Sequence, residues 1–115
     1  YGTMTRKILP AETYVICFSE TSNSTPHHAV ELPLLSTVTM GTEYIVRNMS
    51  KTNVQNVYCY IHDDEPNDSY YFGWSSASET YSSPITIPTN WREIQLIPYQ
   101  DTSGGRRWMI KKYNY

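Results

Sequence analysis

The segment WREIQLIPYQDTSGGRRWMIKKY, residues 91–113, sets the expectation for the whole chain. Two runs in it alternate apolar and polar residues with the period of two that is typical of β-strands. Ile94 and Leu96 share one face of the first run, and Trp108 and Ile110 share one face of the second. The polar stretch between the runs, residues 101–105, ends in two glycines, which allow the positive φ angles of a chain reversal. This segment therefore predicts a β-hairpin.

A lone hairpin is only marginally stable in water, so this one needs further sheet to pack against. Residues rich in β-branched and aromatic side chains, separated by turn-forming residues, supply the candidate strands. We expect these strands at residues 11–18, 27–35, 43–48, 54–62, 69–74 and 85–87. The first run, AETYVICF, predicts a strand buried on both faces. Pro33 cannot donate to a ladder, so it predicts an edge position or a bulge for the second.

With the hairpin, these runs make about eight short strands, and no part of the chain shows helical periodicity. We therefore predict an all-β fold, a single antiparallel β-sandwich of jelly-roll-like form. A length of 115 residues fits one domain and is too short for two ordinary ones. We place this domain at residues 11–115. Residues 1–10, which end at Pro10, are interpreted as a connector from a preceding stalk or domain.

Composition excludes several classes of partner. The formal net charge of −2 gives no general attraction to phosphate backbones. The cationic residues Arg106, Arg107, Lys111 and Lys112 are too few to predict a nucleic-acid surface. No apolar run approaches the roughly 20 residues that cross a bilayer, so we expect no membrane insertion. Cys17 and Cys59 could form one disulfide, but we favour two small buried side chains with free thiols.

The acidic loop, residues 62–68, is the first place to look for chemistry. It contains Asp63, Asp64, Glu65 and Asp68. Glycosidases need two carboxyl groups about 5 Å or about 6.5–9.5 Å apart, flanking the scissile bond. Carboxylates gathered on one loop are more simply explained as solvated groups, and no nucleophile motif or phosphate-binding glycine loop occurs. We therefore expect no catalytic residues and no enzyme.

The acidic loop is also a candidate site for a metal ion. Its carboxylates are the hard oxygen ligands that Ca²⁺ takes, but the spaced D-x-D-x-D-G pattern of a calcium loop is missing. The histidine pair at residues 27–28 has no evident further ligands for a transition metal. We expect neither a metal site nor a cofactor.

Ligand binding is the better hypothesis for this region. Aromatic rings beside carboxylates suit sugars, because C–H faces stack on rings while hydroxyl groups donate to carboxylate oxygens. The alternative is that the rings fill the core or a subunit interface. The candidate ligand-binding residues are Tyr58, Tyr60, Asp63, Asp64, Tyr70, Tyr71 and Trp74.

Self-assembly offers a second use for the same loop. The acidic loop of one subunit would meet the cationic side chains of a neighbour at Arg106, Arg107, Lys111 and Lys112. Apolar residues on both faces of the strands also favour a homo-oligomer, because monomers seldom expose large contiguous apolar patches. Salt would weaken an exposed ionic contact of this kind.

Four short motifs occur in a particular order: VELPL at residues 30–34, GTEYIVRN at 41–48, Trp91 followed by Ile94-Gln-Leu96, and RWMI at 107–110. This order resembles the C-terminal β-domains of bacteriophage tail fibres, tail spikes and related virion fibres. The similarity covers about residues 29–112, and the tyrosine-rich middle, residues 58–81, departs from it. The resemblance implies a trimeric knob that ends a fibre and contacts the host-cell surface.

These observations lead to one main expectation and two alternatives. We expect a non-enzymatic knob on the extracellular face of a virion that binds a host-cell surface receptor, with a glycan as one candidate. The first alternative is a carbohydrate-binding module or accessory domain of a secreted enzyme, which would be monomeric. The second is a purely structural virion decoration protein, which would not bind host cells.

Overall fold

The computed structural model describes residues 5–17, 28–50, 56–66, 71–73, 80–89 and 92–114. Within these ranges the chain forms ten β-strands and one short 3₁₀ helix, η1 (Leu35–Thr37). No helix in the same ranges is long or apolar enough to cross a membrane. The prediction of an all-β fold is confirmed.

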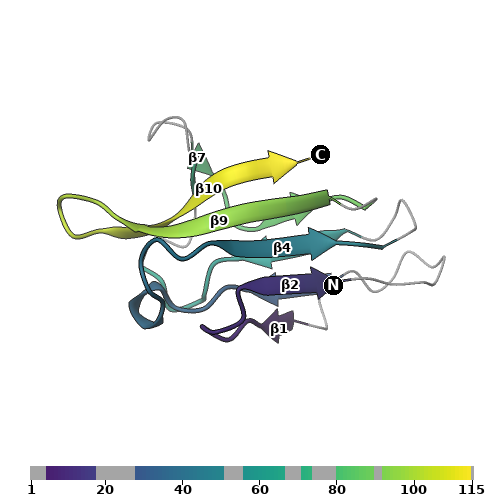
Figure 1. Cartoon of the computed structure of the whole chain (residues 1–115), viewed down its shortest axis with the longest axis horizontal. Coiled ribbons are helices and arrows are strands. Elements are labelled where there is room, and N and C mark those ends of the chain that lie inside the picture. The colour runs from purple at the N-terminus through teal and green to yellow at the C-terminus, as the bar shows by residue number, and fades with distance from the viewer. Residues whose placement is uncertain are drawn as a thin grey trace.

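The strands form two sheets that lie as layers on one another (Figure 1). One sheet has four strands, in the spatial order β1 (Thr5–Lys7), β3 (His28–Glu31), β5 (Val57–Tyr60) and β8 (Ile85–Ile87). The other has six, in the order β2 (Tyr14–Cys17), β4 (Tyr44–Asn48), β9 (Arg92–Gln100), β10 (Arg106–Asn114), β6 (Tyr71–Gly73) and β7 (Thr80–Tyr81).

The predicted hairpin is confirmed as the antiparallel pair β9–β10 at the centre of the six-stranded sheet. Met109 lies opposite Ile97, and the register shifts by one residue between Ile110 and Lys112. In the turn, Gly104 adopts a φ of 92°, which side chains with a Cβ rarely tolerate. The alternation of β9 and β10 sends Ile94, Leu96, Trp108 and Ile110 into the core, as their spacing predicts.

The core fills the space between the two sheets. Along each strand, alternate residues point inward, so each layer contributes one apolar face. The four-stranded sheet and its flanking residues supply Ile8, Val30, Leu32, Val57, Cys59, Ile61, Ile85 and Ile87. The six-stranded sheet supplies Val15, Cys17, Tyr44, Val46, Ile94, Leu96, Trp108 and Ile110. Leu35 of η1 joins the same cluster.

The antiparallel prediction is wrong, because both sheets are mixed. The pairs β1–β3, β3–β5, β2–β4 and β6–β10 are parallel. For the first three pairs, the physical reason is the path of the chain, which alternates between the layers from β1 to β5. Strands that neighbour each other in one sheet are therefore separated by a strand of the other sheet, and both run in the same direction.

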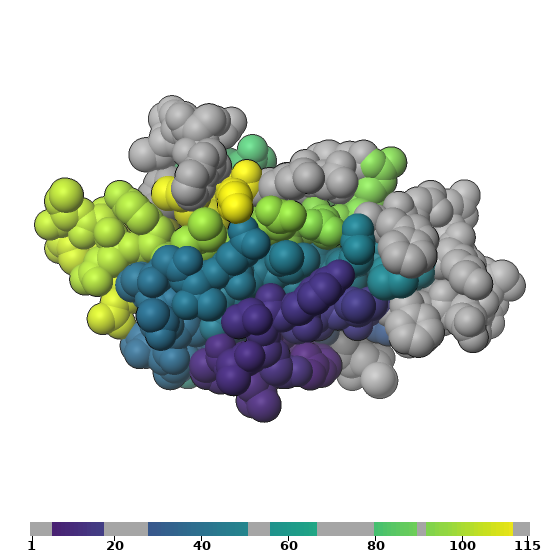
Figure 2. All heavy atoms as spheres, viewed as in Figure 1, coloured from purple at the N-terminus to yellow at the C-terminus, as the bar shows by residue number. Residues whose placement is uncertain are grey.

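Strand β2 corrects a second expectation. Val15 and Cys17 are buried, but Tyr14 and Ile16 keep 55% and 48% of their surface exposed. β2 is therefore buried on one face only. β2 lies at the edge of the six-stranded sheet, and its outer face is at the surface of the molecule (Figure 2).

Three further boundaries differ from the sequence-based expectation. Residues 5–7, expected in the connector, form β1, which pairs with β3, and Ile8 is buried behind it. Pro33 follows β3 and leaves its ladder intact, and β3 lies inside its sheet between β1 and β5. Residues 80–81, which lie outside every expected strand, form β7.

Buried polar side chains tie the two layers together. Asn48 of β4 is fully buried, and its Nδ2 donates to the carbonyl oxygen of Ile87 in the other sheet at 2.9 Å. Its Oδ1 accepts a hydrogen bond from the Ser50 N–H at 2.9 Å. Cys17 and Cys59 are buried and form no disulfide with each other. Burial raises the pKa of the Cys17 thiol to about 11.

Candidate functional site

The end cleft is a hollow of about 400 Å³ beside the β9–β10 turn. Figure 1 shows this turn projecting at one end of the two sheets. Three segments that are far apart in the sequence form its walls: η1 with the residue before it, the loop after β5, and the hairpin turn. Strand β10 runs from this end toward the opposite one. The lining residues are Leu34, Leu35, Ser36, Asp64, Glu65, Pro66, Gly104, Gly105, Arg106 and Arg107.

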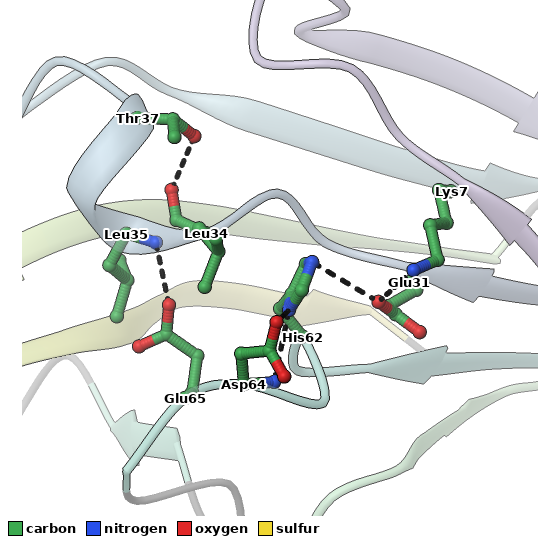
Figure 3. Close-up of polar contacts among 8 residues, drawn as sticks. All are labelled: Lys7, Glu31, Leu34, Leu35, Thr37, His62, Asp64 and Glu65. Carbon is green, nitrogen blue, oxygen red and sulfur yellow. Dashed lines mark hydrogen bonds and ion pairs between the residues drawn. The ribbon is translucent and has the colours of Figure 1, made fainter.

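One wall is the loop after β5, and local hydrogen bonds fix its shape. The Glu65 N–H donates to the His62 carbonyl oxygen at 3.0 Å, and the Asp64 N–H donates to His62 Nδ1 at 3.0 Å. Glu65 Oε1 accepts a hydrogen bond from the Leu35 N–H at 2.7 Å (Figure 3). Glu65 thereby joins this loop to the start of η1, and one of its two carboxylate oxygens is held in place.

The opposite wall is the hairpin turn, which Asp101 organises. Asp101 Oδ1 accepts hydrogen bonds from the Ser103 hydroxyl at 2.7 Å and from the Gly105 N–H at 2.8 Å. These bonds, first that of the Ser103 side chain and then that of Gly105, hold the pKa of Asp101 below its usual value of 3.8. A Cβ at Gly105 would lie 2.9 Å from Asp101 Oδ2, so this close approach requires glycine.

Two arginines leave this turn at the start of β10 and complete the second wall. Arg107 Nη1 donates to the carbonyl oxygen of Arg106 at 2.9 Å, which restrains the guanidinium group. Arg106 is exposed and Arg107 is half-buried. Two arginines of the hairpin and two acidic residues of the loop, Asp64 and Glu65, therefore line the same hollow.

The outer face of the four-stranded sheet adjoins this loop and carries a buried carboxylate. Glu31 is only 4% exposed, although its neighbours Val30 and Leu32 point into the core. Its Oε2 lies 3.6 Å from Lys7 Nζ and 3.6 Å from His62 Nε2 (Figure 3). Because His62 Nδ1 accepts a backbone N–H, the proton of the neutral ring is on Nε2, which faces Glu31.

Two predicted ligand residues, Tyr58 and Tyr60, lie on this outer face. Both belong to β5, whose Val57 and Cys59 point into the core, and both are half-buried. Neither lines the end cleft, and both make contacts with other residues. Tyr60 lies beside Glu31 in the β3–β5 register. The tyrosines thus form a face next to the end cleft.

The other predicted ligand-binding residues do not gather at one site. Asp64 lines the end cleft, with its side chain 80% exposed, whereas the exposed Asp63 does not line it. The backbone of Tyr71 belongs to β6, in the other sheet from Tyr58 and Tyr60. Tyr70 and Trp74 lie outside the described residues.

The sequence did not predict that Arg106 and Arg107 face the acidic loop of their own chain. Their place after the turn could be read from residues 101–107, but the approach of the β5 loop depends on the tertiary fold. Lys111, also assigned to a contact between subunits, lies 2.7 Å from Glu43 of the same chain, measured from Nζ to Oε2. Of the cationic side chains assigned to a contact between subunits, Lys111 thus has an acidic partner in its own chain, outside the acidic loop.

A second hollow, the outer groove, lies on the outer face of the six-stranded sheet. Its volume is about 690 Å³ and its lining is mainly apolar. Tyr99, which is 39% exposed, lies on its rim beside Ile97 and Met109 of the hairpin. The complete lining consists of Met40, Gly41, Ile97, Pro98, Tyr99, Gln100 and Met109.

Among the described residues, no group of three or more His, Cys, Asp or Glu side chains is arranged to hold a metal ion. The end cleft is therefore characterised by its mixed charge and its aliphatic floor. Comparison with protein-family models, curated proteins and solved structures gives no match to this chain.

Proposed function

We propose that this chain is a non-enzymatic binding domain that attaches to a cell-surface receptor, with a glycan as the ligand class, through the end cleft. The observation that carries the proposal is the pairing of two arginines with two carboxylates across a small hollow with aliphatic side chains. Sugars present hydroxyl groups that both donate and accept, together with C–H faces that pack on apolar surface. Each of these features has a counterpart among the cleft residues.

The arrangement of the carboxylates favours binding over hydrolysis. Glycosidases place two carboxyl groups on opposite sides of the bond that they cleave. The cleft-lining acidic residues, Asp64 and Glu65, are neighbours on one wall, and Arg106 and Arg107 belong to the other. Such an arrangement holds a polar ligand through hydrogen bonds from both sides.

The setting that we propose is the tip of a virion fibre, where a jelly-roll-like knob would form a trimer. The motif order described above is the basis for this setting and for the number three. One structural feature supports it. The outer groove and the exposed Tyr14 and Ile16 offer apolar surface that sister copies would cover.

Binding of fluorescently labelled domain to candidate host cells tests the proposal. Glu65→Gln and Arg107→Gln should each reduce binding about tenfold or more, because each removes a charged hydrogen-bonding group worth roughly 1.5–3 kcal/mol. The matched controls are Glu43→Gln and Lys111→Gln, which change the charge equally but lie on the outer face of the six-stranded sheet. Full binding by both cleft variants would contradict the proposal.

The second candidate function is a carbohydrate-binding module of a secreted enzyme. It would use the same lining of the end cleft, whose charged and aliphatic residues suit a sugar in either setting. The two candidates differ in oligomeric state. Light scattering at micromolar concentration measures this state. A monodisperse monomer would favour the module, whereas a stable trimer would favour the fibre knob.

A further inference from the structure

Resting on the proposed function, we propose that the end cleft selects neutral, hydroxyl-rich sugars and discriminates against sugars that carry carboxylate or sulfate groups. Figure 3 shows the loop wall on which this selection depends, with Glu65 directed at the Leu35 backbone.

The first argument is the balance of charge in the end cleft. Arg106 and Arg107 bring two positive charges, and Asp64 and Glu65 bring two negative ones. Asp101 adds a third carboxylate directly behind the arginine wall, with its oxygens close to Gly105. An anionic ligand would find its attraction to the arginines offset by repulsion from these carboxylates.

The second argument is the hydrogen-bonding state of Glu65. Its Oε1 is occupied by the Leu35 N–H at 2.7 Å, which leaves the other oxygen as an acceptor for a ligand. An ionised carboxylate can only accept hydrogen bonds, so it requires a donor such as a hydroxyl group. A sugar hydroxyl meets this requirement, whereas a ligand carboxylate or sulfate placed there would set two acceptors against each other.

The third argument is that other lining residues suit the remaining parts of a sugar, its oxygen atoms and its C–H groups. Arg107 lines the same hollow, and its guanidinium, restrained by the Arg106 carbonyl, is a group that would donate to the oxygen atoms of the same ligand. Leu34, Leu35 and Pro66 supply aliphatic surface for the C–H groups of a sugar ring. The volume of about 400 Å³ lies near the lower limit of small-molecule sites, roughly 300–1,000 Å³.

The test uses immobilised pairs of oligosaccharides that share one neutral core and differ only in an added sialic acid or sulfate on the terminal sugar. We expect the domain to bind the neutral member at least about tenfold more tightly than its acidic partner. Binding of the neutral member should change little between low and high salt, because no net ionic contact is formed.

Variants assign this selectivity to the end cleft. Glu65→Gln keeps an oxygen for the Leu35 N–H but loses the charged acceptor, so binding of neutral sugars should fall about tenfold. Arg107→Lys serves as a second variant that keeps the charge and loses the planar fork of donors. Glu43→Gln, with the same charge change far from the cleft wall, should bind like the original protein.

The outcomes separate this inference from the proposed function. Preferential binding of the acidic members, abolished by Arg107→Lys, would overturn the selectivity and leave the end cleft as the receptor site. Neutral binding that is untouched by Glu65→Gln and Arg107→Lys would overturn both the selectivity and the assignment of the site. Cell binding that the cleft variants abolish, with no oligosaccharide bound, would overturn the sugar class alone.

Discussion

Trp108 has the largest side chain among the fully buried residues, and its ring meets Tyr44 edge to face. The ring centroids are 5.2 Å apart and the planes are inclined at 89°, which is an edge-to-face geometry that aromatic pairs prefer. Trp108→Ala would leave a large cavity between the sheets. We expect the free energy of unfolding to fall by about 3–5 kcal/mol.

Denaturant unfolding followed by circular dichroism measures this loss. Tyr99→Ala is the control, because Tyr99 is the next aromatic residue of the hairpin but points outward and is partly exposed. Its substitution should change the free energy of unfolding by no more than about 0.5 kcal/mol. Equal losses for the two variants would show that Trp108 is not the centre of the core.

At the scale of elements, the β9–β10 hairpin could be predicted together with its inward faces, because alternation is a local property. Its register and turn depend on residues within one short segment. Ile94 and Trp108, for example, point into the core as their spacing predicts. The pairing of β2 with β4 could not be predicted. It depends on which layer receives each strand, and the run Tyr14–Cys17 is as apolar as a strand buried on both faces.

In the candidate site, too, features of one segment could be predicted from the sequence, whereas contacts between distant segments could not. Asp64 was identified because acidic residues gather in one loop. The role of Arg106 and Arg107 was missed, because the meeting of this loop with the hairpin turn is a long-range consequence of the topology. Tyr58 and Tyr60 alternate with core residues along β5, a pattern that is visible in the sequence, but that they do not line the end cleft depends on the tertiary fold.

The hairpin turn should depend on the ionisation of Asp101. Its folded pKa is lower than its unfolded value, so its contribution to stability is present above the unfolded value of 3.8. This contribution is lost as the pH falls through the lower, folded pKa. Asp101→Asn should therefore lower the melting temperature at neutral pH and have a smaller effect in acid. A difference between the two proteins that is constant across this pH range would contradict the role of the carboxylate.

At the scale of the whole molecule, the two hollows divide the surface by chemistry. The end cleft is lined by charged and aliphatic residues, whereas the outer groove is mainly apolar and lies on the broad face of the six-stranded sheet. The two hollows adjoin at the hairpin, where Arg107 of the cleft lies opposite Tyr99 of the groove. In the proposed setting, a receptor would occupy the end cleft while sister copies cover the outer groove.

Backbone amide chemical shifts, recorded while a neutral oligosaccharide that binds is added, test the central claim most directly. The account predicts that the shifts that move cluster at residues 34–36, 64–66 and 104–107, the three segments of the end cleft. Shifts that move instead around Ile97 and Met109 in the outer groove, or around Tyr58 and Tyr60 on β5, would contradict it.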